Sequence, residues 1–151
     1  MRLTRQTNYA IRILMYCAAN EGRLSRIPAI AASYNVSELF LFKILQPLVE
    51  NGFIATVRGR NGGVKLAKPA AEISLFDVVR VTEEGFSMAE CFDADSDCPL
   101  TDSCGLNAAL RRALNAFFEV LAGVSIASLT TPESDIHRRL GLDELIFQQA
   151  S

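Results

Sequence analysis

The chain has 151 residues and a mass of 16.5 kDa, with 50% hydrophobic and 21% charged residues. A disordered protein is excluded, because a chain of this length and composition can form one ordinary core with an appended element. Charged or polar residues interrupt its apolar runs well short of the roughly 18 residues that span a bilayer, so no membrane span is expected. Residues 1–8 are largely polar rather than secretory in character, which predicts a cytoplasmic protein.

Charge is divided unevenly along the chain. Residues 1–80 contain eleven Lys and Arg against five Asp and Glu, whereas residues 81–151 contain four against twelve. A basic segment attracts polyanions and an acidic segment repels them. Nucleic-acid binding is therefore expected in the first half.

The first half has the periodicity of three helices. Residues 4–19 form the first, and its predicted apolar side consists of Ile11, Leu14, Met15 and Ala18. Ser25 is expected to cap the second, with Pro28 in its first turn. Ser37 caps the third, whose predicted inward residues are Leu41, Ile44, Leu45 and Leu48. Pro47 predicts a kink in this helix or its early end.

A β-hairpin is predicted after the third helix. Residues 53–57 and 64–66 are short apolar runs, and the glycine-rich segment between them contains Asn61-Gly62, which tolerates positive φ. Two helices joined by a tight turn form a helix-turn-helix unit, and the hairpin adds a wing to it. The expected fold is mainly α with a small β-hairpin wing.

A fourth helix, a loop and a long helix follow. Ser74 caps the fourth helix, and residues 87–104 lack periodicity and are predicted to form a loop. A long helix begins near Gly105 with apolar residues at coiled-coil spacing: Leu106, Leu110, Ala113, Phe117, Val120 and Val124. No other predicted helix matches it in length, so its expected partner is a second copy of the chain in a homodimer.

These elements divide the chain into four parts. They are a winged helix-turn-helix DNA-binding domain at residues 1–82, a cysteine loop at 83–104, a dimerisation helix and its end at 105–130, and a C-terminal tail at 131–151. The tail carries a small apolar set for which packing and fraying are both open: Leu140, Leu142, Leu145, Ile146 and Phe147.

Three of the four cysteines, Cys91, Cys98 and Cys104, lie in one loop, whereas Cys17 stands alone in the first helix and is expected to be core. Disulfides are not expected in a reducing compartment. Zinc fits poorly, because no tight C-x2-4-C pair is present and His137 is the only histidine. The residues alone leave an iron-sulfur cluster, zinc and redox-active thiols open.

Candidate DNA contacts lie on the third helix, the hairpin and the N-terminus. A helix fits the major groove, and the helix candidates are Ser37, Glu38, Phe40 and Lys43, with a core position equally open for Phe40. A glycine-rich wing lets an arginine enter the minor groove or contact phosphate. The wing candidates are Arg58, Arg60, Asn61 and Gly62, and the N-terminal candidates are Arg2 and Thr4.

Three sequence features resemble one family. They are residues 1–4 with Tyr9-Ala10, the wing at 57–64, and the loop cysteines before a long helix. Together they resemble the winged-helix iron-sulfur transcription regulators of the IscR, NsrR and RirA type, over residues 1–130. Residues 37–48, 73–83 and 98–107 look closest to the rhizobial iron regulators of the RirA type.

The resemblance implies a dimeric repressor of iron-uptake genes that binds a double-stranded DNA operator when iron is plentiful. It also implies an iron-sulfur cluster, of the 4Fe-4S or alternatively the 2Fe-2S type, on Cys91, Cys98 and Cys104. IscR-like proteins have a histidine ligand at the position of Asn107, and NsrR-like proteins can use an aspartate at that of Asn8. Neither asparagine is a good iron ligand, so an open, labile iron suited to sensing iron or oxidants is expected.

Two other regulators and an enzyme are the alternatives. The regulators are a cluster-free thiol redox switch and a nitric-oxide sensor. A small redox enzyme is the least favoured reading, because no Ser-His-Asp set, phosphate loop or paired-carboxylate motif is present.

Overall fold

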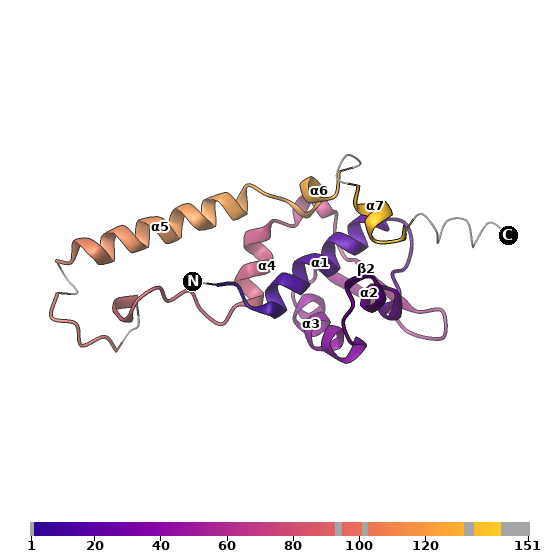
Figure 1. Cartoon of the computed structure of the whole chain (residues 1–151), viewed down its shortest axis with the longest axis horizontal. Coiled ribbons are helices and arrows are strands. Elements are labelled where there is room, and N and C mark those ends of the chain that lie inside the picture. The colour runs from indigo at the N-terminus through magenta and orange to yellow at the C-terminus, as the bar shows by residue number, and fades with distance from the viewer. Residues whose placement is uncertain (1, 93–94, 101–102, 132–134, 143–151) are drawn as a thin grey trace.

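The computed structural model describes residues 2–92, 95–100, 103–131 and 135–142 (Figure 1). A body of short helices and a two-stranded hairpin carries a long arm, formed by α5 (Gly105–Ala122) and the cysteine loop at its far end (Figure 1). The predicted fold class, mainly α with a β-hairpin wing, is confirmed. Within the described ranges no helix combines the length and the apolar character that crossing a membrane requires.

Helix α1 (Arg5–Ala19) is the central helix of the body. The Thr4 hydroxyl caps it by accepting from the Thr7 amide at 3.2 Å. Its buried residues are Thr7, Ala10, Ile13, Leu14, Tyr16 and Cys17. The predicted apolar side is confirmed in part: Leu14 is fully buried, whereas Ile11, Met15 and Ala18 are half-buried and pack against the core. Helical spacing predicts a single buried face, whereas α3, α4, α6 and β2 all pack against α1, so more than one side of this helix is covered.

Helices α2 (Ile27–Tyr34) and α3 (Glu38–Glu50) form the helix-turn-helix pair. The predicted cap at Ser37 is confirmed, because its hydroxyl accepts from the Phe40 amide at 3.2 Å. The predicted cap at Ser25 is wrong, since Arg26 holds the N-cap position of α2 and makes no side-chain cap. Ser25 instead pairs its backbone with Val64 through two hydrogen bonds of 2.8 Å, which extends the hairpin.

Helix α3 continues through Pro47 to Glu50, so of the two outcomes predicted from the proline, a kink or an early end, the early end is wrong. Proline lacks the N–H that would bond to the carbonyl of Lys43. Lys43 lies on the exposed side of the helix, where water can satisfy that carbonyl at little cost. The predicted buried residues Leu41, Ile44, Leu45 and Leu48 are confirmed.

The hairpin pairs β1 (Ile54–Val57) with β2 (Gly63–Leu66) in antiparallel register. The hairpin was predicted correctly, but its positive φ falls on Gly59 at 111° rather than on Asn61-Gly62. Gly62 is required for another reason: a Cβ there would meet the Val57 carbonyl oxygen at 2.2 Å. A Cβ on Gly63 would meet the Ser25 carbonyl oxygen at 2.6 Å. These glycines permit close backbone approach.

The short helix η1 (Ala70–Glu72) leads into α4 (Leu75–Thr82), which carries the predicted cap. Ser74 and Asp77 form a capping box, and the hydrogen bond from the Ser74 hydroxyl lowers the pKa of the Asp77 carboxyl. Helix α4 packs against α5, with the rings of Phe76 and Phe118 5.2 Å apart. After α5, α6 (Ile126–Leu129) returns to the body, where Ile126 is fully buried.

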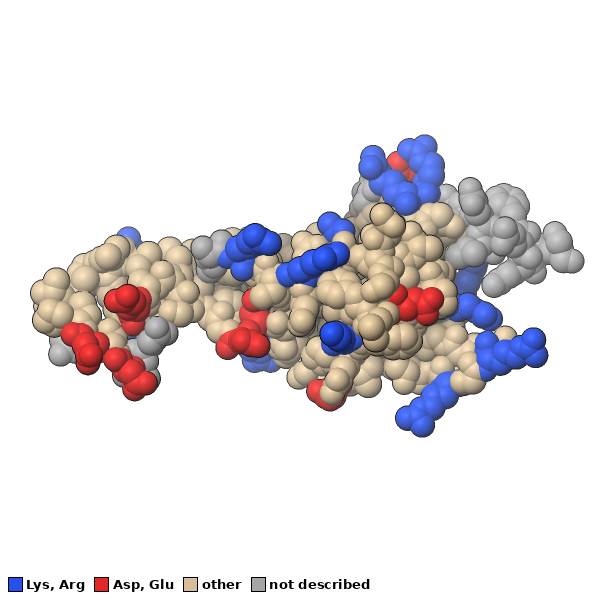
Figure 2. Space-filling model, turned by 60° about the horizontal axis from the view of Figure 1, so that its bottom comes forward, with Lys and Arg blue, Asp and Glu red and all other residues tan. Residues whose placement is uncertain are grey.

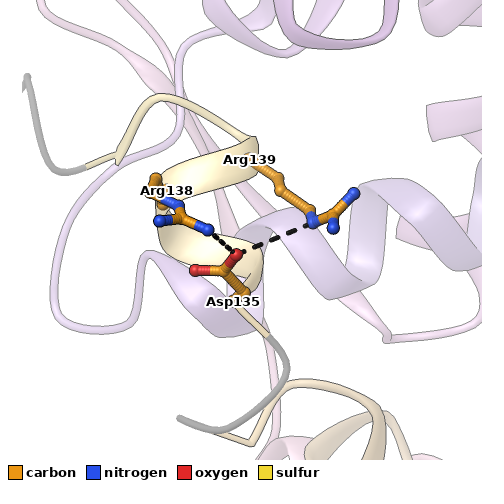
Figure 3. Close-up of polar contacts among 3 residues, drawn as sticks. All are labelled: Asp135, Arg138 and Arg139. Atoms are coloured by element: carbon orange, nitrogen blue, oxygen red, sulfur yellow. Dashed lines mark hydrogen bonds and ion pairs between the residues drawn. The ribbon is translucent and has the colours of Figure 1, made fainter.

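The C-terminal part of the described chain packs on the body through α7 (Ile136–Arg139) and the residues after it. His137 Nε2 lies 2.6 Å from the Ala19 carbonyl oxygen, and the Ser33 hydroxyl donates to the Leu140 carbonyl at 3.0 Å. Leu142 is buried in the core, which favours packing over fraying for this part of the tail. Leu145, Ile146 and Phe147 lie outside the described residues. Two arginines of this segment, Arg138 and Arg139, point toward Asp135 (Figure 3).

Candidate functional site

The outer face of α3 exposes large apolar residues. Leu39 is 71% exposed and Phe42 is 54% exposed, beside the exposed Lys43 and Gln46. Phe40 turns the other way: its ring makes an edge contact with Tyr9 at 5.3 Å and is half-buried. Leu39 and Phe42 were not predicted as candidates from the sequence, although both lie off the stripe of buried leucines and isoleucine.

The wing lies next to this face and is separated from it by a groove. The groove has a volume of about 610 Å³ and is lined by residues of α3, α2 and the hairpin, among them Phe42, Val57 and Arg60. Arg26 donates to the Asn61 side-chain oxygen at 3.3 Å, which ties the tip of the wing to the start of α2. Arg58 and Arg60 are exposed, so both are available to a polyanion.

The N-terminal candidates have different surroundings. Arg2 is exposed, whereas the Thr4 amide and hydroxyl both donate to Glu83 Oε1, at 2.7 and 3.1 Å. The buried Thr7 hydroxyl donates to the Thr82 hydroxyl at 2.8 Å. These bonds fasten the start of α1 to the end of α4, where the arm begins.

Charge is separated along the molecule. Figure 2 shows acidic side chains at the end formed by the cysteine loop and basic side chains projecting from the opposite end of the body. The described acidic residues of the loop include Glu90, Asp95 and Asp97. A DNA duplex is therefore attracted to the helix-turn-helix end and repelled by the loop.

The three loop cysteines occupy different environments. Cys91 is half-buried in η2 (Glu90–Phe92), Cys98 is exposed, and Cys104 is the N-cap residue of α5. Among the described residues no three His, Cys, Asp or Glu side chains are gathered closely enough to hold a metal ion. The donor set nevertheless fits an iron-sulfur cluster chemically, because thiolates are its usual protein ligands.

Asn107 links the loop to α5. It is only 7% exposed, and its Nδ2 donates to the Cys91 carbonyl oxygen at 3.2 Å. Its Oδ1 accepts from Arg111 Nε at 2.7 Å, and the Arg111 guanidinium lies 4.9 Å from the centre of the Phe92 ring. The Asn107 side-chain amide therefore links the loop residue Cys91 to Arg111 of α5.

Helix α5 has an apolar face with no cover in the described chain. Leu106 is 63% exposed and Val120 is 67% exposed, and both belong to the coiled-coil pattern of the sequence. The residues that face the rest of the chain are on a neighbouring side of the helix and include Leu114 and Phe118.

Cys17 has the buried environment predicted for it. Burial raises the pKa of its thiol to about 12. We expect Cys17 to resist iodoacetamide in the folded protein at pH 8, where almost no thiolate exists, and to react once denaturant is added. Mass spectrometry of labelled peptides measures this, and labelling of Cys17 at the rate of the exposed Cys98 would contradict its burial.

Comparisons with known proteins agree with this architecture. The model of the Rrf2 family, described as "Iron-dependent Transcriptional regulator", matches residues 3–132. Protein aau3 of Rhizobium meliloti (strain 1021) is 66% identical over 152 residues, which cover 100% of this chain and 99% of that protein. The HTH-type transcriptional regulator NsrR of Geobacillus kaustophilus (strain HTA426) is 44% identical over 142 residues, covering 93% and 97%.

Solved structures place the fold in the same group. The oxidized form of Staphylococcus aureus CymR matches with a TM-score of 0.71 and 27% identity, covering 86% of this chain and 96% of that one. The T. potens IscR structure matches with a TM-score of 0.67 at 21% identity, covering 85% of each chain. The family model and the NsrR relative are both described as transcriptional regulators, which confirms the expectation of a regulator rather than an enzyme. The chain therefore belongs to the Rrf2 family of winged-helix, DNA-binding transcription regulators.

Proposed function

We propose that the protein is an iron-responsive repressor of iron-uptake genes that senses iron or oxidants through a labile iron-sulfur cluster. Cys91, Cys98 and Cys104 are the proposed protein ligands. The observation that carries this proposal is the attachment of the cysteine loop to α5: Cys104 occupies the N-cap position of that helix, and the Cys91 carbonyl accepts from Asn107 in its first turn. The family description as iron-dependent and the sequence resemblance to the RirA type support it.

DNA binding is assigned to α3 and the wing. Ser37, Glu38 and Lys43 are exposed on or beside α3, and Arg58, Arg60, Asn61 and Gly62 belong to the wing. The exposed Phe42 joins this set, while the half-buried Phe40 supports the helix through Tyr9. Arg2 is the N-terminal contact, and Thr4 acts through its bonds to Glu83.

A homodimer is proposed from the uncovered face of α5. A second copy of the helix would bury Leu106 and Val120, and it would set the distance between two recognition helices on a two-fold operator. Cys91, Cys98 and Cys104 would hold the cluster, which would supply a cross-link between the loop and α5. In the absence of the cluster the loop would be held to α5 by weaker contacts, among them those of Asn107, Arg111 and Phe86, so the spacing of the winged domains would change and DNA would be released.

The test compares operator affinity with and without the cluster. Protein purified without oxygen is expected to be brown and to contain iron and sulfide. A duplex selected from a random pool by this protein serves as the operator. At one salt concentration the cluster-loaded protein is expected to bind it about tenfold or more tightly than the cluster-free protein. Equal affinities would show that the cluster does not control DNA binding. Tighter binding by the cluster-free protein would show that cluster loss promotes binding instead of release.

Nitric-oxide sensing is the second candidate. The sequence resemblance to the NsrR type implies this function, and the 44% identity with NsrR of Geobacillus kaustophilus favours it. Iron chelation and nitric oxide separate the two functions when each is applied to the cluster-loaded protein on its operator. Release by a chelator at concentrations that deplete free iron supports iron sensing. Release by nitric oxide alone supports the second candidate, and a colourless protein that responds to thiol oxidants supports a cluster-free switch.

A further inference from the structure

Asn107 is one of three buried polar or charged residues in the described part of the chain. Both ends of its amide are used, the nitrogen by the Cys91 carbonyl and the oxygen by Arg111 Nε. A buried amide with both groups satisfied is stable, whereas loss of either partner leaves a polar group unpaired. The position therefore requires a side chain that donates and accepts at once.

Arg111 reinforces the same contact one residue further along the loop. Its guanidinium lies over the ring of Phe92, which follows Cys91 directly. Asn107 and Arg111 are four residues apart on α5, so they stand on one side of the helix and hold consecutive loop residues. Twelve residues separate Cys91 from Cys104, a length that does not by itself hold the first cysteine close to the helix.

We infer that Asn107 and Arg111 form an anchor that positions Cys91 beside the start of α5 in the cluster-free protein. Asn107 is thus a positioning residue and not an iron ligand. The importance of the anchor for the cluster rests on the proposed function, because it requires Cys91 to be a ligand. The anchor itself concerns only the cluster-free chain, and the two are tested separately.

The first test measures alkylation of cluster-free, reduced protein by iodoacetamide, with mass spectrometry of each cysteine peptide. Asn107→Ala is expected to raise the labelling rate of the half-buried Cys91 by about fivefold relative to that of the exposed Cys98. Asn107→Asp is expected to act in the same direction, since a carboxylate accepts from Arg111 but cannot donate to the Cys91 carbonyl.

Two further variants complete this test. Arg111→Lys keeps a cation and a donor and is expected to preserve slow Cys91 labelling better than Arg111→Ala. Asn115→Ala is the matched control, because Asn115 is exposed on the same helix. A Cys91 rate in Asn107→Ala equal to that of the natural protein would overturn the anchor. Equal acceleration at Cys91 and Cys98 with a lower melting temperature would also overturn it, because that result indicates general unfolding.

The second test measures iron release from the reconstituted protein to a chelator. Asn107→Ala is expected to release iron about fivefold faster than the natural protein and the Asn115→Ala control. Faster Cys91 labelling with unchanged iron release would support the anchor but contradict the proposed ligand role of Cys91. Failure of the anchor and failure of the proposed function therefore give different results.

Discussion

Replacing Cys91, Cys98 or Cys104 with Ala is expected to abolish the visible absorbance of the reconstituted protein, together with its bound iron and sulfide. Three thiolates leave no spare ligand, since the remaining cysteine, Cys17, is 4% exposed in the core. Cys91 lies in η2 and Cys104 at the N-cap position of α5, both half-buried. The measurement is the absorbance spectrum after anaerobic reconstitution, with iron and sulfide analysis.

Cys17→Ala is the matched control for these variants. It removes a thiol from the α1 side of the core and leaves the loop unchanged. We expect full cluster content and a small loss of stability, of about 1 kcal/mol. A Cys91→Ala protein that retains full cluster content would remove Cys91 from the ligand set.

Most elements of the DNA-binding body can be predicted from residues that are close together in the sequence. Ser37 and Ser74 are predicted as helix caps from residue type and position. Both predictions are confirmed, because each hydroxyl bonds to an amide only three residues further along the chain. The hairpin was predicted from two apolar runs around a glycine-rich turn, although Gly59 rather than Asn61 takes the positive φ. Each of these features depends on neighbours in sequence.

The features that sequence reasoning missed depend on distant parts of the chain. Ser25 looked like a cap but pairs with Val64, and only the folded hairpin brings the two together. The sequence marks Asn107 only as a poor iron ligand, and its bond to the Cys91 carbonyl involves a backbone group that no sequence pattern indicates. Thr4 is predicted as a DNA contact, and the structure adds its bonds to Glu83 at the end of α4, which no nearby residue in the sequence indicates. All three contacts join residues that are distant in the sequence, so the local pattern does not indicate them.

Loss of the wing arginines is expected to have a large effect on DNA binding. Arg58→Ala combined with Arg60→Ala is expected to weaken operator binding by about tenfold or more. It should also reduce the slope of log K against log salt by about one for each phosphate that no longer has an arginine beside it. Both arginines are exposed on a turn shaped by Gly59 and by the close approach at Gly62, so their removal leaves the backbone intact.

Arg138→Ala combined with Arg139→Ala is the charge-matched control for the wing, since it removes two exposed arginines at α7. Its affinity and salt slope are expected to stay close to those of the natural protein. Circular dichroism and cluster content should be unchanged in both double variants, because all four side chains are exposed. If the double wing variant bound with the affinity and salt slope of the natural protein, the hairpin would not touch DNA. Recognition would then rest on Arg2 and on α3, where the exposed Phe42 lines the groove beside the wing.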